Sequence, residues 1–308
     1  MPASAPPDPV PRDGTDDGHP AGVRRAGAST ARVARRLARR RRRSGHRGSG
    51  LPLVLFVPAL LGLAFLLLPL AALLVRAPWS TLPAQLLSPE VGQALRLSLL
   101  CGTLATLICL LLGVPLAWLL ARVEFPGRRL VRAVVTVPLV LPPVVGGVAL
   151  LLLLGRRGLL GARLELWFGV SLPFTTAAVV IAEAFVALPF LVIAVEGALR
   201  GADRRYEDAA ATLGASRWSI FRRVTLPLVA PGVVAGAVLC FARALGEFGA
   251  TITFAGNFPG VTRTMPLSVY LALETNPEAA VVLSLVLLAV SVLVLASLRD
   301  RWVGGTAT

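Results

Sequence analysis

Lysine is absent from this chain, and all 31 of its basic residues are arginine. The phosphate-binding loop of P-loop nucleotide hydrolases requires a lysine, so the chain cannot form that site. Its two histidines, His19 and His46, lie within the first 50 residues, which excludes a histidine-based triad or metal cluster from the remainder. We therefore expect no catalytic residue, no metal site and no cofactor in this chain.

Charged residues are also few, at 15%, whereas hydrophobic residues make up 56% of the chain. With a mean hydropathy of +0.76, this is the composition of an integral membrane protein. Cys101, Cys109 and Cys240 fall inside apolar runs, where we expect small packing residues and no disulfides. A membrane enzyme would need a catalytic cluster of side chains in these runs, and the sequence contains none.

Six apolar runs are long enough to cross a membrane, which takes about 20 residues for about 30 Å of hydrocarbon. They predict an all-α integral membrane protein with six transmembrane helices. The runs cover residues 51–75, 97–120, 133–154, 175–195, 228–250 and 279–298.

Prolines interrupt two of these runs. The third contains P-L-V-L-P-P-V-V-G-G, from Pro138 to Gly147, and the fourth contains Pro189. Broken helices survive in lipid only where neighbours or water satisfy the freed backbone groups. The prolines therefore indicate a pathway through the protein or a tight helix interface, with a static kinked bundle as the alternative.

The net charge of +15 is unevenly placed, because twelve of the 31 arginines precede residue 48. A nucleic-acid-binding protein would carry this charge on a folded domain, so we expect no nucleic-acid partner. With the N-terminus inside, the loops beyond the tail place twelve arginines on the cytoplasmic side and five outside, as the positive-inside rule requires. This orientation places residues 200–227 and a C-terminal tail, 299–308, in the cytoplasm.

The first 50 residues contain almost no large apolar side chains, and we expect them to form a disordered, arginine-rich cytoplasmic tail. Its arginine run suits anionic lipid head groups. A bare topology signal and a start codon placed too early are the alternatives. A secretory signal peptide is a poor fit, because the apolar run of residues 51–75 is too long.

A polar segment between Arg200 and Pro227 predicts a helix–turn–helix between two membrane spans. Four residues share one face of the first helix at positions i, i+3, i+4 and i+7: Tyr206, Ala209, Ala210 and Leu213. Gly214 stands where the residue after a helix end belongs, and Ser216 can cap a second helix that begins at Arg217. This face of small side chains could form a contact surface for another protein.

This segment resembles the cytoplasmic coupling loop of ABC-importer permeases, in which E-A-A, three residues, glycine, nine residues and I-x-L-P follow one another. Asp208-Ala209-Ala210, Gly214, Val224, Leu226 and Pro227 fit that spacing. Asp208 replaces the glutamate and Val224 the isoleucine. The resemblance implies that a partner ATPase docks on Tyr206, Glu207, Asp208, Ala209, Ala210, Leu213 and Gly214.

Arg243 and Glu247 lie at the outer end of the fifth run. A charge at the centre of a span costs about 2.5–3.5 kcal/mol, so such residues are normally paired or functional. Arg243 can pair with Glu247 on its own helix, although arginine before glutamate is the less favourable order. Pairing with Glu183 of the fourth run, or attraction of an anion, are the alternatives. Gly246 and Gly249 leave room for close helix approach or for bare backbone along a path.

The stretch R-A-L-G-E-F-G-A-T-I-T-F-A-G-N-F-P-G-x-T-x-T-x-P, from Arg243 to Pro266, looks like the fifth-span signature of molybdate permease subunits. Sulfate and thiosulfate permeases carry a similar G-E-[FY]-G core. The resemblance covers residues 95–298 and implies a path or gate built from Glu183, Arg243, Gly246, Glu247, Gly249 and Thr251.

The resemblance implies a type I ABC-importer permease fold, with a first transmembrane helix at 51–75 and a core of five helices at 95–298. It further implies a homodimer in a bacterial plasma membrane, two copies of a separate ATPase that uses ATP and Mg, and an extracytoplasmic molybdate-binding protein that sets most of the selectivity. Sulfate, thiosulfate and tungstate are alternative substrates. A structural membrane protein without transport activity is a remote alternative.

Overall fold

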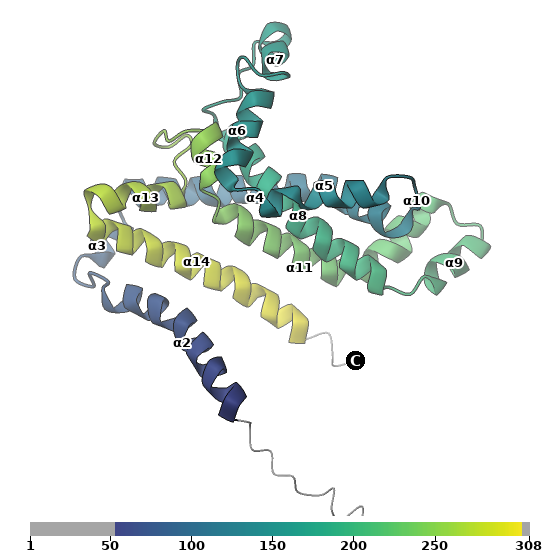
Figure 1. The fold of residues 1–308 in the computed structure, drawn as a ribbon, viewed down its shortest axis with the longest axis horizontal. Helices are drawn as coiled ribbons and strands as arrows, with labels where there is room; N and C mark the ends of the chain where they lie inside the picture. Colours follow the sequence, from purple (N-terminus) through teal and green to yellow (C-terminus); the bar gives the residue numbers. More distant parts are fainter. Residues whose placement is uncertain (1–52, 304–308) are drawn as a thin grey trace, which may run out of the picture. The chain divides into compact units, whose positions relative to one another are not determined.

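The computed structural model describes residues 53–303, and every regular element among them is helical (Figure 1). The described chain divides into two units, with the boundary between Leu66 and Leu67, inside the first helix. Predictions for the tail of residues 1–50 lie outside the described residues. The helices are α2 (Leu53–Val75), α3 (Leu82–Leu86), α4 (Pro89–Arg122), α5 (Arg128–Val140), α6 (Pro143–Leu154), α7 (Gly161–Phe168), α8 (Thr176–Gly201), α9 (Arg205–Thr212), α10 (Arg217–Ile220), α11 (Leu226–Leu245), α12 (Gly249–Phe254), α13 (Met265–Thr275) and α14 (Pro277–Val303).

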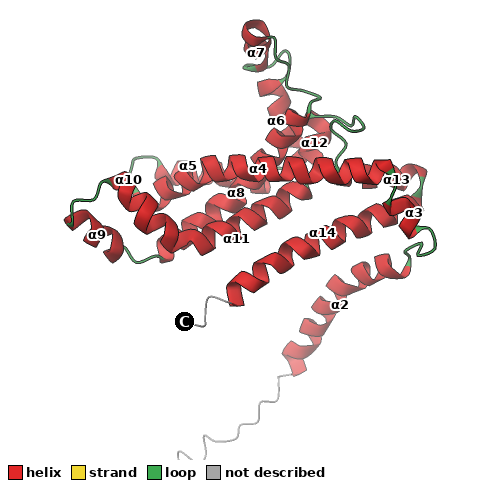
Figure 2. Ribbon diagram, turned by 180° about the vertical axis from the view of Figure 1, so that it is seen from behind, coloured by secondary structure: helices red, strands yellow, loops and turns green. Residues whose placement is uncertain are grey.

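Three helices, α4, α8 and α11, pack against one another and form the core of the second unit (Figure 2). Small side chains line their contacts, and Cys101, Cys109 and Cys240 are completely buried and free. The thiol of Cys109 donates a hydrogen bond to the carbonyl oxygen of Ala184, at 3.4 Å. The three cysteines therefore act as packing residues, as the sequence predicts.

Five helices of the described chain are long and apolar enough to cross a membrane, and a sixth span results if α5 and α6 count as one. These two helices meet at an angle of 116°, so the predicted span 133–154 is not a single straight helix. Leu141 is extended (φ −66°, ψ 127°) because it precedes Pro142, and a proline disfavours helical geometry in the residue before it. The predicted interruption of the third span is therefore confirmed.

Pro189, by contrast, does not interrupt the fourth span, and this prediction was wrong. Helix α8 continues through it from Thr176 to Gly201. Pro189 is buried in the three-helix core. A single proline removes only one backbone hydrogen bond of the helix, and α5 continues through Pro138 in the same way although none of its residues is buried.

The fifth span also differs from its predicted bounds of 228–250. A continuous helix begins earlier, at Arg217, and passes through a π turn at Phe221–Thr225 before α11. It ends at Leu245, and the chain resumes as the short helix α12 after three non-helical residues. The last helix, α14, continues to Val303, so the first residues of the predicted tail 299–308 are helical.

Helices α6 and α12 approach each other through glycines. A Cβ atom on Gly147 would lie 2.8 Å from the carbonyl oxygen of Ala250, and one on Gly249 would lie 2.9 Å from Cβ of Pro143. The predicted close approach is thus confirmed for Gly249. Gly246 is exposed, and a Cβ there would meet only its own helix.

Candidate functional site

The fifth span breaks where its charged residues lie. Arg243 stands in the last turn of α11, and Glu247 lies in the non-helical segment that follows. The two side chains form an ion pair at 2.6 Å, in which Arg243 is 26% exposed and Glu247 only 1%. Of the three predicted partners for Arg243, the structure brings Glu247 to it.

Glu247 has a second role, which sequence reasoning missed. Its other carboxylate oxygen accepts a hydrogen bond from the backbone N–H of Ala250, at 2.9 Å, and so caps the first turn of α12. Because Glu247 lies beyond the end of α11, the unfavourable order of arginine before glutamate does not apply to this pair. A cation in the last turn of α11 also interacts favourably with the helix dipole. Glu247 therefore joins the two helices across the break.

Glu183 lies in α8 with 1% of its surface exposed, and it forms no ion pair with Arg243 in the described part of the chain. Its Oε2 atom and the hydroxyl oxygen of Thr251 are both buried without a hydrogen-bond partner among the described residues. The six residues predicted for the path or gate thus divide into the Arg243–Glu247 pair, the two unsatisfied side chains of Glu183 and Thr251, the exposed Gly246, and Gly249, which packs against α6.

Replacing Arg243 by alanine should destabilise the protein by about 3–5 kcal/mol, because it leaves the buried charge of Glu247 unpaired. The double variant Arg243→Ala, Glu247→Gln should recover much of this loss, since glutamine removes the charge but still accepts from Ala250. Unfolding midpoints of the purified variants measure the effect. An Arg263→Ala variant is the control, because the Arg263 side chain bonds the uncharged Asn257 and forms no ion pair with the described residues. Equal stability of the single and double variants would contradict the prediction.

The polar segment forms the predicted helix–turn–helix. Helix α9 ends in a turn at Gly214, whose φ of +82° is a left-handed conformation that favours glycine. The hydroxyl oxygen of Ser216 accepts a hydrogen bond from the N–H of Ser219, at 3.3 Å, and caps α10, which begins at Arg217.

The predicted docking face of α9 is exposed. Tyr206 is 61% and Leu213 88% exposed, and Ala209 between them is exposed as well. Glu207 differs from the other predicted docking residues, because its carboxylate turns inward to Arg122 of α4, at 2.9 Å. Trp218 of α10 is 69% exposed and stacks on Phe221. It was not among the predicted docking residues, although a tryptophan in a polar loop indicates a binding surface.

A cleft of about 390 Å³ lies between α9 and the end of α4. Arginine and acidic side chains line it together with two aromatic rings, and the Arg122–Glu207 pair belongs to its wall. The lining includes Trp118, Arg122, Glu124, Arg204, Glu207, Asp208, Arg217 and Phe221.

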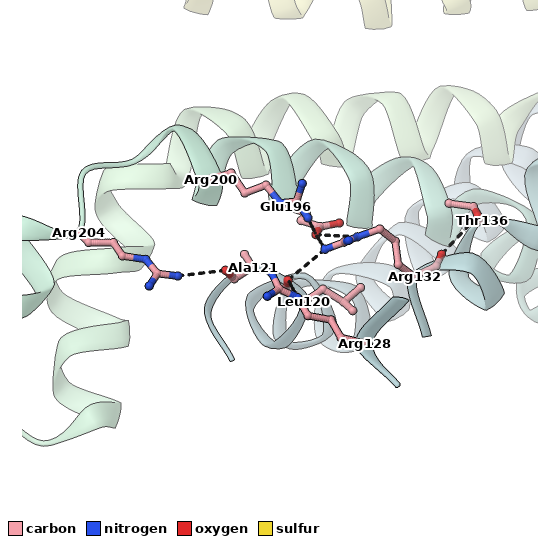
Figure 3. Close-up of polar contacts among 8 residues, drawn as sticks. All are labelled: Leu120, Ala121, Arg128, Arg132, Thr136, Glu196, Arg200 and Arg204. Atoms are coloured by element: carbon pink, nitrogen blue, oxygen red, sulfur yellow. Dashed lines mark hydrogen bonds and ion pairs between the residues drawn. The ribbon is translucent and has the colours of Figure 1, made fainter. Parts of the chain in front are cut away.

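Three arginines converge on the last carbonyl groups of α4 (Figure 3). Arg128 donates to the carbonyl oxygen of Leu120 at 2.8 Å, Arg132 to the same oxygen at 3.4 Å, and Arg204 to that of Ala121 at 3.3 Å. Helix ends leave such carbonyls unsatisfied, and cations there also interact favourably with the helix dipole. Sequence reasoning counted these arginines only as topology signals.

Comparisons with known proteins show which proteins this chain is similar to. Residues 110–304 match the family described as binding-protein-dependent transport system inner membrane component. The molybdenum transport system permease protein ModB of Mycobacterium tuberculosis is 50% identical over 263 residues, which cover 85% of this chain and 99% of that protein. The sulfate transport system permease protein CysT of Escherichia coli is 38% identical over 238 residues, 76% of this chain and 86% of that protein.

Among solved structures, the fold is similar to that of a bacterial alginate ABC transporter in complex with an alginate pentasaccharide-bound periplasmic protein. The TM-score is 0.68, and the match covers 84% of this chain and 96% of that one at 17% identity. At this identity the likeness concerns the fold alone.

Proposed function

Because this chain belongs to the family of binding-protein-dependent transport system inner membrane components, we propose that it is the permease subunit of an ABC importer for molybdate. The observation that carries this proposal is 50% identity, over 85% of the chain, to a protein named for molybdenum transport. The chain is an all-α multi-pass membrane protein with the expected permease fold. Its own residues form the path for the anion and connect the ATPase docking face to the gate. ATP and Mg are bound by the partner ATPase.

The partners follow from the surfaces described above. Two copies of an ABC ATPase dock on the exposed faces of α9 in a homodimer of this chain, with α9 and both termini in the cytoplasm. The alanines at the centre of that face leave space for a complementary surface, and Tyr206 and Leu213 offer exposed apolar contacts beside them. An extracytoplasmic binding protein delivers the anion at the opposite side.

The conduit holds its anion weakly. Arg243 is the cation nearest the break in the fifth span, and Glu247 already neutralises it. A site that binds weakly releases its ion quickly, which suits a conduit. We therefore assign most of the selectivity to the binding protein. ATP-driven closure of the ATPases displaces α9, and the break at residues 246–248 responds as the outer gate.

Sulfate is the second candidate, because the sulfate permease is also related over most of the chain, at 38% identity. Tungstate, which has the same shape and charge as molybdate, is a further alternative cargo, and thiosulfate is another sulfur oxyanion. The two permease comparisons favour molybdate, since the identity to the molybdenum protein is higher.

Deletion of the gene should abolish uptake of radiolabelled molybdate at low concentration and leave sulfate uptake unchanged. Complementation with the wild-type gene should restore it, and unlabelled tungstate and sulfate, added as competitors, show which anions share the importer. Normal molybdate uptake in the deletion strain, together with lost sulfate uptake, would overturn molybdate in favour of sulfate.

A further inference from the structure

The end of α4 is joined to the docking helix α9 by a largely buried ion pair. The guanidinium of Arg122 lies 2.9 Å from the carboxylate of Glu207, with side-chain exposures of 7% and 18%. Arg122 also donates to the carbonyl oxygen of Ala202, at 3.5 Å, in the linker that leads to α9. This pair bridges the cleft between the two helices. A second ion pair of the same loop, Arg205–Asp203, is long at 3.9 Å and largely exposed.

The end of α4 is itself fixed to two other helices. Arg132 of α5 donates to the last carbonyls of α4 and also forms an ion pair with Glu196 of α8, at 2.6 Å. Arg200, one turn further along α8, contacts the same carboxylate at 2.6 Å (Figure 3). With its terminal carbonyls bonded, the last turn of α4 is protected from fraying. A displacement applied at Arg122 therefore reaches an ordered helix end.

Helix α4 extends from this cluster to the opposite side of the protein. It has 34 residues, which corresponds to about 51 Å at 1.5 Å per residue. Near its other end, the hydroxyl oxygen of Ser98 accepts a hydrogen bond at 2.8 Å from the backbone N–H of Met265, where α13 begins. Ser98 and Met265 are 1% and 0% exposed. A Cβ on Gly102 would meet the ring of Phe241, shortly before the break in the fifth span.

We propose that Arg122 and Glu207 are positioning residues that transmit the displacement of α9 to α4, and through α4 to the outer segments around Met265. This inference rests on the proposed importer function and adds a route through α4 to the response of the fifth-span break proposed above. Arginine suits the position because one terminal nitrogen of Arg122 contacts both the carboxylate of Glu207 and the carbonyl oxygen of Ala202, and its charge persists when it is buried. A buried pair resists separation more than an exposed one, so the Arg205–Asp203 pair should contribute little.

The test uses the full-length permease with its ATPase in lipid nanodiscs. Spin labels at two exposed positions, Leu100 of α4 and Leu152 of α6, report the distance between these helices with and without ATP. The three native cysteines are buried and should remain unlabelled. The variants are Arg122→Ala, Glu207→Gln and the exchange Arg122→Glu with Glu207→Arg. Arg205→Ala is the matched control, because it removes an arginine from the same loop.

We expect ATP to change the label distance in the wild type and in Arg205→Ala, and to leave it unchanged in Arg122→Ala and Glu207→Gln. Binding-protein-stimulated ATP turnover should fall about tenfold in these two variants, within the range of coupling between distant sites. The exchange should recover part of the change, since a glutamate at the end of α4 opposes the helix dipole.

Each possible result either supports or overturns the proposed transmission through Arg122 and Glu207. Loss of the distance change while the ATPase still co-purifies in normal amount supports transmission. The proposal is overturned if the ATPase no longer co-purifies, which would mean a structural role, if the variants respond like the wild type, or if the wild type shows no change. The label measurement needs only ATP and the ATPase, so it remains informative if uptake assays show that molybdate is not the cargo.

Discussion

Replacing Ala209 by arginine should abolish ATP-driven uptake while the protein still inserts into the membrane in normal amount. Ala209 lies on the exposed face of α9, between Tyr206 and Leu213, where its small side chain leaves space for a partner. A long charged side chain would hold the ATPase away from this face. We expect association to weaken by at least about 2 kcal/mol, the size of an interface hot spot.

Co-purification of the ATPase and uptake in membrane vesicles measure this effect. The control is Gly201→Arg, which adds an arginine at an exposed position at the end of α8, where a Cβ meets nothing within 4 Å. That variant should keep most of its activity. Normal binding-protein-stimulated ATP turnover with Ala209→Arg would show that the ATPase does not use this face.

Replacing Gly147 by valine should destabilise the protein by about 3 kcal/mol, the upper part of the range for overpacked sites. A Cβ at this position would lie 2.8 Å from the backbone oxygen of Ala250 and 2.7 Å from Cβ of Thr253, so α6 and α12 would have to separate. Because α12 is capped by Glu247, we expect the Arg243–Glu247 pair to be disturbed as well. Unfolding midpoints of the purified protein provide the measurement.

The control for Gly147 is Gly92→Val. Gly92 lies in α4, and a Cβ there meets nothing within 4 Å. Valine has a slightly higher helix propensity than glycine, so this variant should be close to neutral. If both valine variants unfolded at the same midpoint, the close packing of α6 on α12 would have no energetic importance.

Features encoded by neighbouring residues could be predicted from the sequence. The turn at Gly214 and the cap at Ser216 depend on local conformational preferences, and both are confirmed. The membrane spans could be predicted because apolar runs of about 20 residues are typical of transmembrane helices. The interruption after Val140 was expected from adjacent prolines, although nothing in the sequence predicted an angle of 116°.

Features that depend on tertiary contacts were missed. Glu207 was grouped with the docking face because its helical position allows that direction, but a cation 85 positions away in the sequence, Arg122, turns it inward. The break after Leu245 gives Glu247 its capping role, and no periodicity in the apolar pattern reveals it. The family roles assigned to the docking and gate residues stay predictions.

The π turn at Phe221–Thr225 has a consequence for how this part of the chain can evolve. A π turn is equivalent to one extra residue inserted in an α-helix. The extra residue is taken up within one wide turn, so the helical segments on either side keep the orientation that an uninterrupted α-helix would give them. Deleting a residue there would restore α-helical geometry and leave Trp218 and the docking loop close to their present direction relative to α11. The loss of one residue within Phe221–Thr225 should therefore be tolerated better than the same deletion elsewhere in this helix, where it would rotate the preceding segment by about 100°.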